Sequence, residues 1–180
     1  MTNKILIVAG VGDALCSSNS RKKIRDNETF VDIIETVIDS FKVKENANGV
    51  VNFHYPTDSF KDVDVFSKVK KTQLVNMRIH GKGFTIKDNE LILNTHDDDD
   101  ETILFNGTEF SHIFRPQEYE VCLCGIDLHG IFANTIEELL EEGYTVKLFS
   151  DASNLLPATR KYISNLSRNK KFQFCSYKSA

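Results

Sequence analysis

The pattern of hydrophobic and polar positions over residues 120–152 predicts a strand, a helix and a second strand. Apolar residues run without a break from Val121 to Cys124, which is typical of a strand that is buried on both faces. Residues 131–140 then carry apolar side chains at helical spacing, and a stripe of glutamates faces the other way. A second apolar run over residues 145–149 follows, so about thirty residues form the right-handed crossover that joins two parallel strands.

The rest of the chain repeats this alternation of strands and helices. Further strands are predicted from apolar runs between turn residues, over residues 4–12, 49–55, 102–105 and 172–177. Further helices are predicted from apolar residues at helical spacing, over residues 29–42 and 155–166. Residues 62–100 are an irregular excursion with short strands. We therefore expect one α/β domain over residues 1–180, a three-layer α/β/α sandwich around a mostly parallel sheet of about six strands.

One set of positions within residues 120–152 carries a family resemblance. These positions are Gly125, Thr135, Gly143, Tyr144, Asp151 and Ala152. Their order resembles that of the isochorismatase-like cysteine hydrolases, a family that includes nicotinamidases. The resemblance implies a hydrolase fold of Rossmann-like topology and a homo-oligomer.

The three catalytic positions of that family do not carry its catalytic residues here. The family uses a cysteine nucleophile at the start of a helix, an acid as general base and a lysine that stabilises the thiolate. The resemblance places Ile131 at the cysteine, Gly10 at the acid and Leu104 or Phe105 at the lysine. None of these side chains can attack a carbonyl, accept a proton or stabilise an anion. The resemblance thus implies a pseudoenzyme that binds a small molecule or a protein partner.

An active hydrolase with rebuilt chemistry is the alternative hypothesis. Asp127 and His129 flank the turn before Ile131, and a histidine with a carboxylate can serve as a general base. The competing interpretation is a turn aspartate and a capping or solvent-facing histidine. Cys124 as a displaced nucleophile is a weaker hypothesis, because a thiol in the middle of a strand should be buried.

Three polar residues near the ends of the first two strands are candidate ligand-binding residues: Asp13, Cys16 and His54. The segment around His54 resembles the D-W-H-P segment that helps to bind a metal in nicotinamidases. Asn52 stands where that segment has its acid, and a neutral amide is a poor ligand for a divalent cation. His54 is therefore the single candidate metal ligand, and no cofactor is predicted.

Composition narrows the class of protein further. With 41% hydrophobic and 27% charged residues and no apolar run of membrane-spanning length, a globular, cytoplasmic protein without membrane contact is expected. The net charge of −4 gives no general attraction to phosphate backbones, so nucleic acid is not an expected partner. The four cysteines lie mostly in or beside apolar runs, which predicts buried free thiols.

Overall fold

The computed structural model describes residues 3–9, 27–43, 47–53, 74–79, 83–87, 90–94, 107–127 and 130–179. Only the backbone is described for residues 47–53, 74–79, 83–87 and 90–94, and for parts of the helices over residues 27–43 and 107–113. None of the helices in these ranges is long and apolar enough to cross a bilayer.

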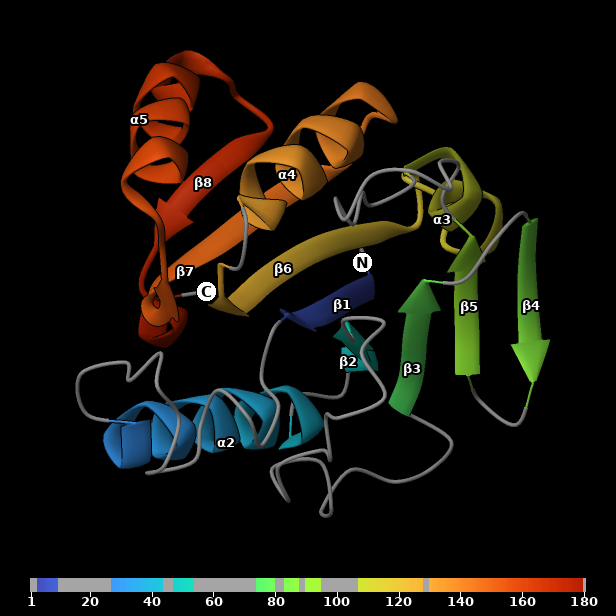
Figure 1. Ribbon diagram of the computed structural model, residues 1–180, viewed down its shortest axis with the longest axis horizontal. Coiled ribbons are helices and arrows are strands. Elements are labelled where there is room, and N and C mark those ends of the chain that lie inside the picture. The colour runs from blue at the N-terminus through green and yellow to red at the C-terminus, as the bar shows by residue number, and fades with distance from the viewer. Residues whose placement is uncertain are drawn as a thin grey trace.

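The described strands form one eight-stranded sheet in the order β4-β5-β3-β2-β1-β6-β7-β8 (Figure 1). The strands are β1 Asn3–Ala9, β2 Ala47–Phe53, β3 Leu74–Ile79, β4 Gly83–Lys87, β5 Glu90–Asn94, β6 Tyr119–Ile126, β7 Thr145–Asn154 and β8 Phe172–Cys175. Every neighbouring pair is parallel except β4 with β5. The predicted fold class is confirmed. The sheet is wider than predicted, because the excursion over residues 62–100 adds β3, β4 and β5 to one side of it.

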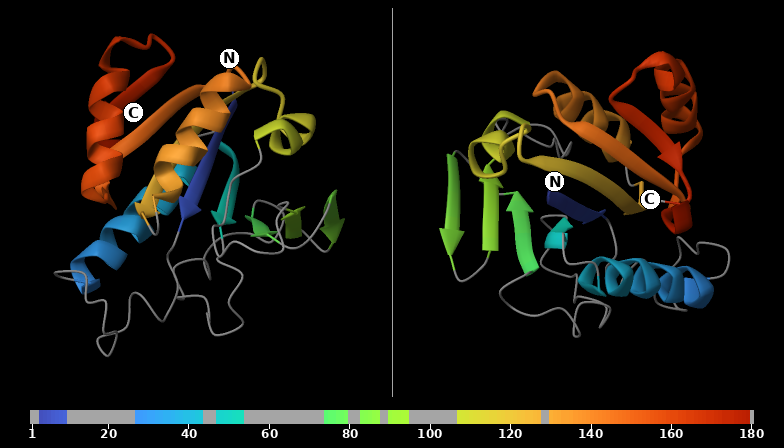
Figure 2. Two further views of the ribbon diagram at one scale, coloured as in Figure 1. Left: turned by 45° about the horizontal axis from the view of Figure 1, so that its top comes forward. Right: turned by 180° about the vertical axis from the view of Figure 1, so that it is seen from behind.

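Helices cover both faces of the sheet (Figure 2). They are α2 Asn27–Val43, α3 Gly107–Ile113, α4 Ile131–Glu141 and α5 Pro157–Asn165. Helix α2 lies on one face, and α4 and α5 lie on the other. The predicted crossover is confirmed, since β6, α4 and β7 follow one another and the two strands pair in parallel.

Strand β1 shows why both faces need helices. Its side chains alternate, so Ile5 and Ile7 join the core under α4 and α5, whereas Leu6 and Val8 join the core under α2. All four side chains are fully buried. A strand with two apolar faces is stable only between two layers, because burying one such side chain contributes about 1.5–3 kcal/mol.

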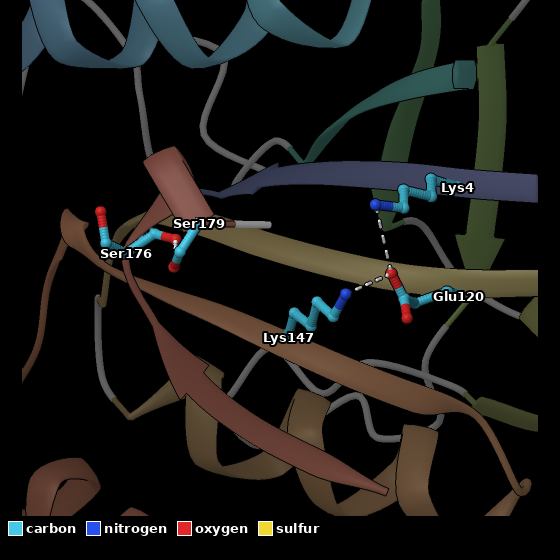
Figure 3. Close-up of polar contacts among 5 residues, drawn as sticks. All are labelled: Lys4, Glu120, Lys147, Ser176 and Ser179. Atoms are coloured by element: carbon cyan, nitrogen blue, oxygen red, sulfur yellow. Dashed lines mark hydrogen bonds and ion pairs between the residues drawn. The ribbon is translucent and has the colours of Figure 1, made fainter. Parts of the chain in front are cut away.

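A half-buried carboxylate links three strands near their amino ends (Figure 3). Glu120 on β6 lies between Lys147 on β7, with Nζ 3.0 Å from Oε1, and Lys4 on β1, with Nζ 3.8 Å from the same oxygen. The side chains of Glu120 and Lys147 are each only 16% exposed. Oε1 accepts no hydrogen bond of good geometry from a described residue, so these contacts are ion pairs.

Strand β7 is longer than its apolar run predicted. The run ends at Phe149, but the strand continues through polar residues to Asn154. The register shifts on the way: Leu123 pairs with Leu148 and Gly125 pairs with Ser153, so five steps along β7 match two along β6. This bulge turns Ser150 and Asp151 to solvent, which explains why hydrophobicity alone could not reveal the second half of the strand.

Candidate functional site at the carboxyl edge of the sheet

The strands that precede the predicted site residues are neighbours in the sheet. Strands β2, β1, β6 and β7 are consecutive and parallel, so their carboxyl ends meet at one edge. The predicted site residues Gly10, Asp13, Cys16, His54, Leu104 and His129 lie outside the described residues. The structure thus shows that β1, β2 and β6, the strands that precede Gly10, His54 and His129, end side by side. Of the predicted site residues it describes Asp127 and Ile131.

Asp127 directly follows β6 and is 2% exposed. Its Oδ1 accepts the backbone N–H of Phe132 at 3.2 Å, and its Oδ2 accepts the backbone N–H of Leu156 at 3.0 Å. Phe132 lies in the first turn of α4 and Leu156 caps α5, so the carboxylate supplies an acceptor to both helix starts. This arrangement is that of a turn aspartate. A catalytic partnership with His129 stays a prediction.

Ile131 is the first residue of α4 and is 3% exposed. It belongs to the same core as Ala9, the last residue of β1, and Phe110 of α3. A helix amino terminus stabilises an anion, which is why a thiolate nucleophile is effective there. In this protein that position holds a hydrocarbon side chain that packs in the core.

Gly125, two residues before Asp127, allows β6 to approach β1 closely. Gly125 has φ 118°, and a Cβ on it would lie 2.1 Å from the carbonyl oxygen of Ala9. Gly130 also has a positive φ of 77°, but a Cβ there would meet nothing within 4 Å. Glycine is therefore required at position 125 because there is no room for a side chain. At position 130 glycine is favoured only because of the positive φ.

The described cysteines are free thiols, as predicted. Cys122 and Cys124 are fully buried, and Cys175 is half-buried. Burial raises the pKa of the Cys122 thiol to about 12, and the Glu120 carboxylate adds to the effect. Burial also raises the pKa of Cys124, with Cys122 as the second cause. The Cys124 thiol is therefore buried, as expected, and its burial disfavours the reactive thiolate.

Sequence patterns did not reveal three residues at this edge. Leu156 beside Asp127 is 39% exposed, which is unusual for a large apolar side chain. Ser153 and Thr159 are buried, and their hydroxyl oxygens have no hydrogen-bond partner among the described residues. Buried hydroxyls are normally bonded, so these two can bond a water or a polar ligand. No sequence motif marks these residues.

Asp151, one of the positions that carried the resemblance, holds the turn after β8. Its carboxylate accepts the hydroxyl of Ser176 and the backbone N–H of Tyr177. Within the described ranges, no group of three His, Cys, Asp or Glu side chains could hold a metal ion.

Comparison with known proteins relates this arrangement to solved structures. No protein-family model matches the sequence, and no curated protein matches it significantly. An isochorismatase-like hydrolase from Alkaliphilus metalliredigens is similar over 99% of this chain and 96% of its own, with 10% identity and a TM-score of 0.62. The pyrazinamidase of Pyrococcus horikoshii, solved in complex with zinc, is similar over 97% of this chain and 99% of its own, with 15% identity and a TM-score of 0.61.

A third similar structure is the MAR1 ribonuclease of Caenorhabditis elegans, with 13% identity and a TM-score of 0.61 over 99% of this chain and 79% of its own. Structural similarity at sequence identities this low establishes the fold and leaves the chemistry open. The fold implied by residues 120–152 is confirmed: the chain has the fold of the isochorismatase-like hydrolases, in a strongly divergent sequence.

Proposed function

We propose that this protein is an isochorismatase-like hydrolase homologue whose Asp, Lys and Cys triad is replaced, and that it acts by binding a small molecule or a protein partner. The observation that carries the proposal is the burial of Ile131 at the start of α4. A cysteine hydrolase needs a reactive thiolate at that helix terminus. An alkyl side chain there supports binding without family-type hydrolysis.

The thiols elsewhere support the same proposal. Burial raises the pKa of Cys122, of Cys124 and of Cys175 alike, so in the described part of the chain each thiol stays protonated at neutral pH. Cys175 also lies on β8, two strands away from β6. Their raised pKa values make these three thiols poor replacements for the family's nucleophile.

The chemistry of the carboxyl edge favours a small, partly apolar ligand with a polar group. Leu156 offers apolar surface, and in the part of the chain that the structure describes the hydroxyls of Ser153 and Thr159 lack hydrogen-bond partners. Amides of the pyrazinamide class, named by the similar pyrazinamidase, are the first ligands to test. RNA is not proposed, because the net charge is −4.

The alternative is an active hydrolase in which Asp127 and His129 form a general base, with a metal at His54. Both oxygens of Asp127 already accept backbone N–H groups, which favours a structural role. Asn52 offers a neutral amide where a divalent cation needs a carboxylate, so the donor set does not fit a metal and no step is assigned to one.

Three further proposals concern the whole protein. We propose a single domain over residues 1–180, supported by the 99% coverage of this chain by one similar structure of nearly equal length. A homo-oligomer and a cytoplasmic location follow from the family resemblance and the composition.

Ligand-observed NMR on the full chain tests binding and turnover in one tube. At least one of the three compounds pyrazinamide, nicotinamide and isochorismate should receive saturation transfer from the protein. No product signals should grow overnight. Leu156→Ala should weaken the transfer, whereas Phe174→Ala, which changes the other exposed large apolar side chain, should not. Product signals that His129→Ala abolishes would overturn the proposal in favour of the rebuilt enzyme.

A further inference from the structure

Strand β8 is the last strand on one side of the described sheet. Among the described residues it pairs with β7 alone, at the end of the sheet (Figure 1). The Val146 N–H donates to the Lys171 C=O at 2.8 Å, so Lys171 turns its carbonyl toward β7. Because the direction of backbone groups alternates along a strand, Phe174 turns its N–H and C=O away from β7. These groups can form main-chain hydrogen bonds with an added strand.

The open edge also carries an exposed aromatic side chain. Phe174 is 46% exposed, whereas Phe172 on the same face of the strand is 8% exposed. Natural edge strands are usually protected by charges, prolines or bulges at such positions. An exposed phenylalanine next to free backbone groups offers both parts of a strand-recognition site: hydrogen bonds and an apolar contact.

Charge singles out the same part of the chain. Residues 152–180 contain six Lys and Arg and no Asp or Glu. The first 151 residues hold the other 16 of the 22 cations and all 26 acids, a net charge of −10. The positive charge is therefore concentrated in α5 and in the segments just before and after β8, although the whole chain is acidic.

Cations lie at both ends of β8. Arg168 and Lys170 precede the strand and Lys178 follows it, and all three side chains are exposed. In the described ranges none of the three forms an ion pair. Lys178 lies 5.9 Å from the ring centre of Tyr177, whereas Lys171 donates to the Gly143 carbonyl at 3.0 Å. Three cationic groups are thus available to carboxylates near the edge.

We propose that β8 is a docking edge for an extended acidic segment of another protein. The segment adds a strand next to β8, contacts Phe174 with an apolar side chain and places carboxylates near Arg168, Lys170 and Lys178. The outward N–H and C=O of Phe174 favour a peptide over RNA, because RNA has no main-chain ladder to offer them. This edge is separate from the carboxyl edge, so the proposal does not depend on catalysis or its absence.

Fluorescence anisotropy with the full chain tests the proposal. The probe is a labelled eight-residue peptide of alternating glutamate and valine, and it should bind more weakly as salt is raised. Two N-methylated forms, one at the odd and one at the even amides, separate main-chain recognition from charge. One form should bind about tenfold more weakly or worse and the other should keep its affinity, since alternate amides of a strand face opposite sides.

Variants locate the binding surface. Phe174→Thr and the double variant Arg168→Glu with Lys170→Glu should each weaken peptide binding about tenfold. Leu156→Ala and Arg115→Glu, an exposed charge change at the Glu118 ion pair, should leave it unchanged. Far-UV circular dichroism confirms that each variant is folded.

The proposal is overturned by absence of peptide binding, by equal binding of both N-methylated forms, or by an octauridylate RNA that binds while the peptide does not. Concentration-dependent dimerisation that Phe174→Thr removes, without peptide binding, would show that the edge serves a second copy of this chain instead.

Discussion

Asp127 Oδ2 accepts the backbone N–H of Leu156 at 3.0 Å, and so the end of β6 is tied to the start of α5, 29 residues further along the chain. The other oxygen bonds Phe132 in α4. One buried carboxylate thereby sets where two helices begin at the carboxyl edge of the sheet. Asp127, at the carboxyl edge of the sheet, therefore has a structural role.

Asp127→Ala should destabilise the protein strongly. It removes the acceptor of two backbone N–H groups, which should lower the free energy of unfolding by about 2–4 kcal/mol in urea denaturation. Asp151→Ala is the matched control, because Asp151 also accepts two hydrogen bonds but is exposed. Its loss should be about 1 kcal/mol. Equal losses of unfolding free energy in the two variants would contradict the structural role of Asp127.

Gly125→Ala should prevent stable folding or cost more than about 4 kcal/mol. The new Cβ would lie 2.1 Å from the Ala9 carbonyl oxygen, and neither backbone can retreat without breaking the β1–β6 pairing. Gly130→Ala has a positive φ but open space around the new Cβ, so about 1–2 kcal/mol is expected. Thermal unfolding of both variants measures the difference, and a milder effect at Gly125 would show that the strands are not in this contact.

The Cys122 thiol should make the protein less stable at alkaline pH. Its pKa is raised from 9.0 to about 12 by burial first and by Glu120 second, so the folded state keeps a proton that the unfolded chain loses. The stabilisation is complete below pH 9.0 and is lost as the pH rises toward 12. Between these values, the unfolding free energy of the wild type should fall more steeply than that of Cys122→Ala, by up to about 1.4 kcal/mol per pH unit. Parallel slopes would contradict the buried thiol.

Glu120 should stabilise the fold because its carboxylate neutralises the half-buried side chain of Lys147. Glu120→Gln leaves Lys147, 16% exposed, without its ion-pair partner and should cost about 2 kcal/mol after allowance for partial exposure. Lys4→Met should cost less than Lys147→Met, because Lys4 lies 3.8 Å from Glu120 Oε1 and is 27% exposed. Urea denaturation at low and high salt gives the order, and the reverse order would show that Lys4 is the main partner.

Much of the fold could be predicted because parallel strands that are buried on both faces have unbroken apolar runs in their sequence. β1 and β6 are read directly from such runs, and α4 from its buried stripe ending at Leu139. The second half of β7 was missed, since a bulge carries polar residues through the strand. Short strands were expected in residues 62–100, but the pattern did not show that β3, β4 and β5 extend the main sheet.

The candidate site was only partly predictable for a related reason. The position of Asp127 could be read from the end of a strand, but its two hydrogen bonds depend on helix starts that are distant in sequence. No local pattern shows that the hydroxyls of Ser153 and Thr159 are buried without a hydrogen-bond partner in the described ranges. Leu156 is exposed only because it caps α5 at the edge of the sheet.

The unfolding free energy of Ile131→Ala is the most direct measurement of the central claim, which is that a packed hydrocarbon closes the start of α4. Ile131 is 3% exposed in the core, so the variant should lose about 2–4 kcal/mol relative to wild type. A loss below about 0.5 kcal/mol, the range of surface substitutions, would contradict the claim and would mean that this helix terminus is open to a reactant.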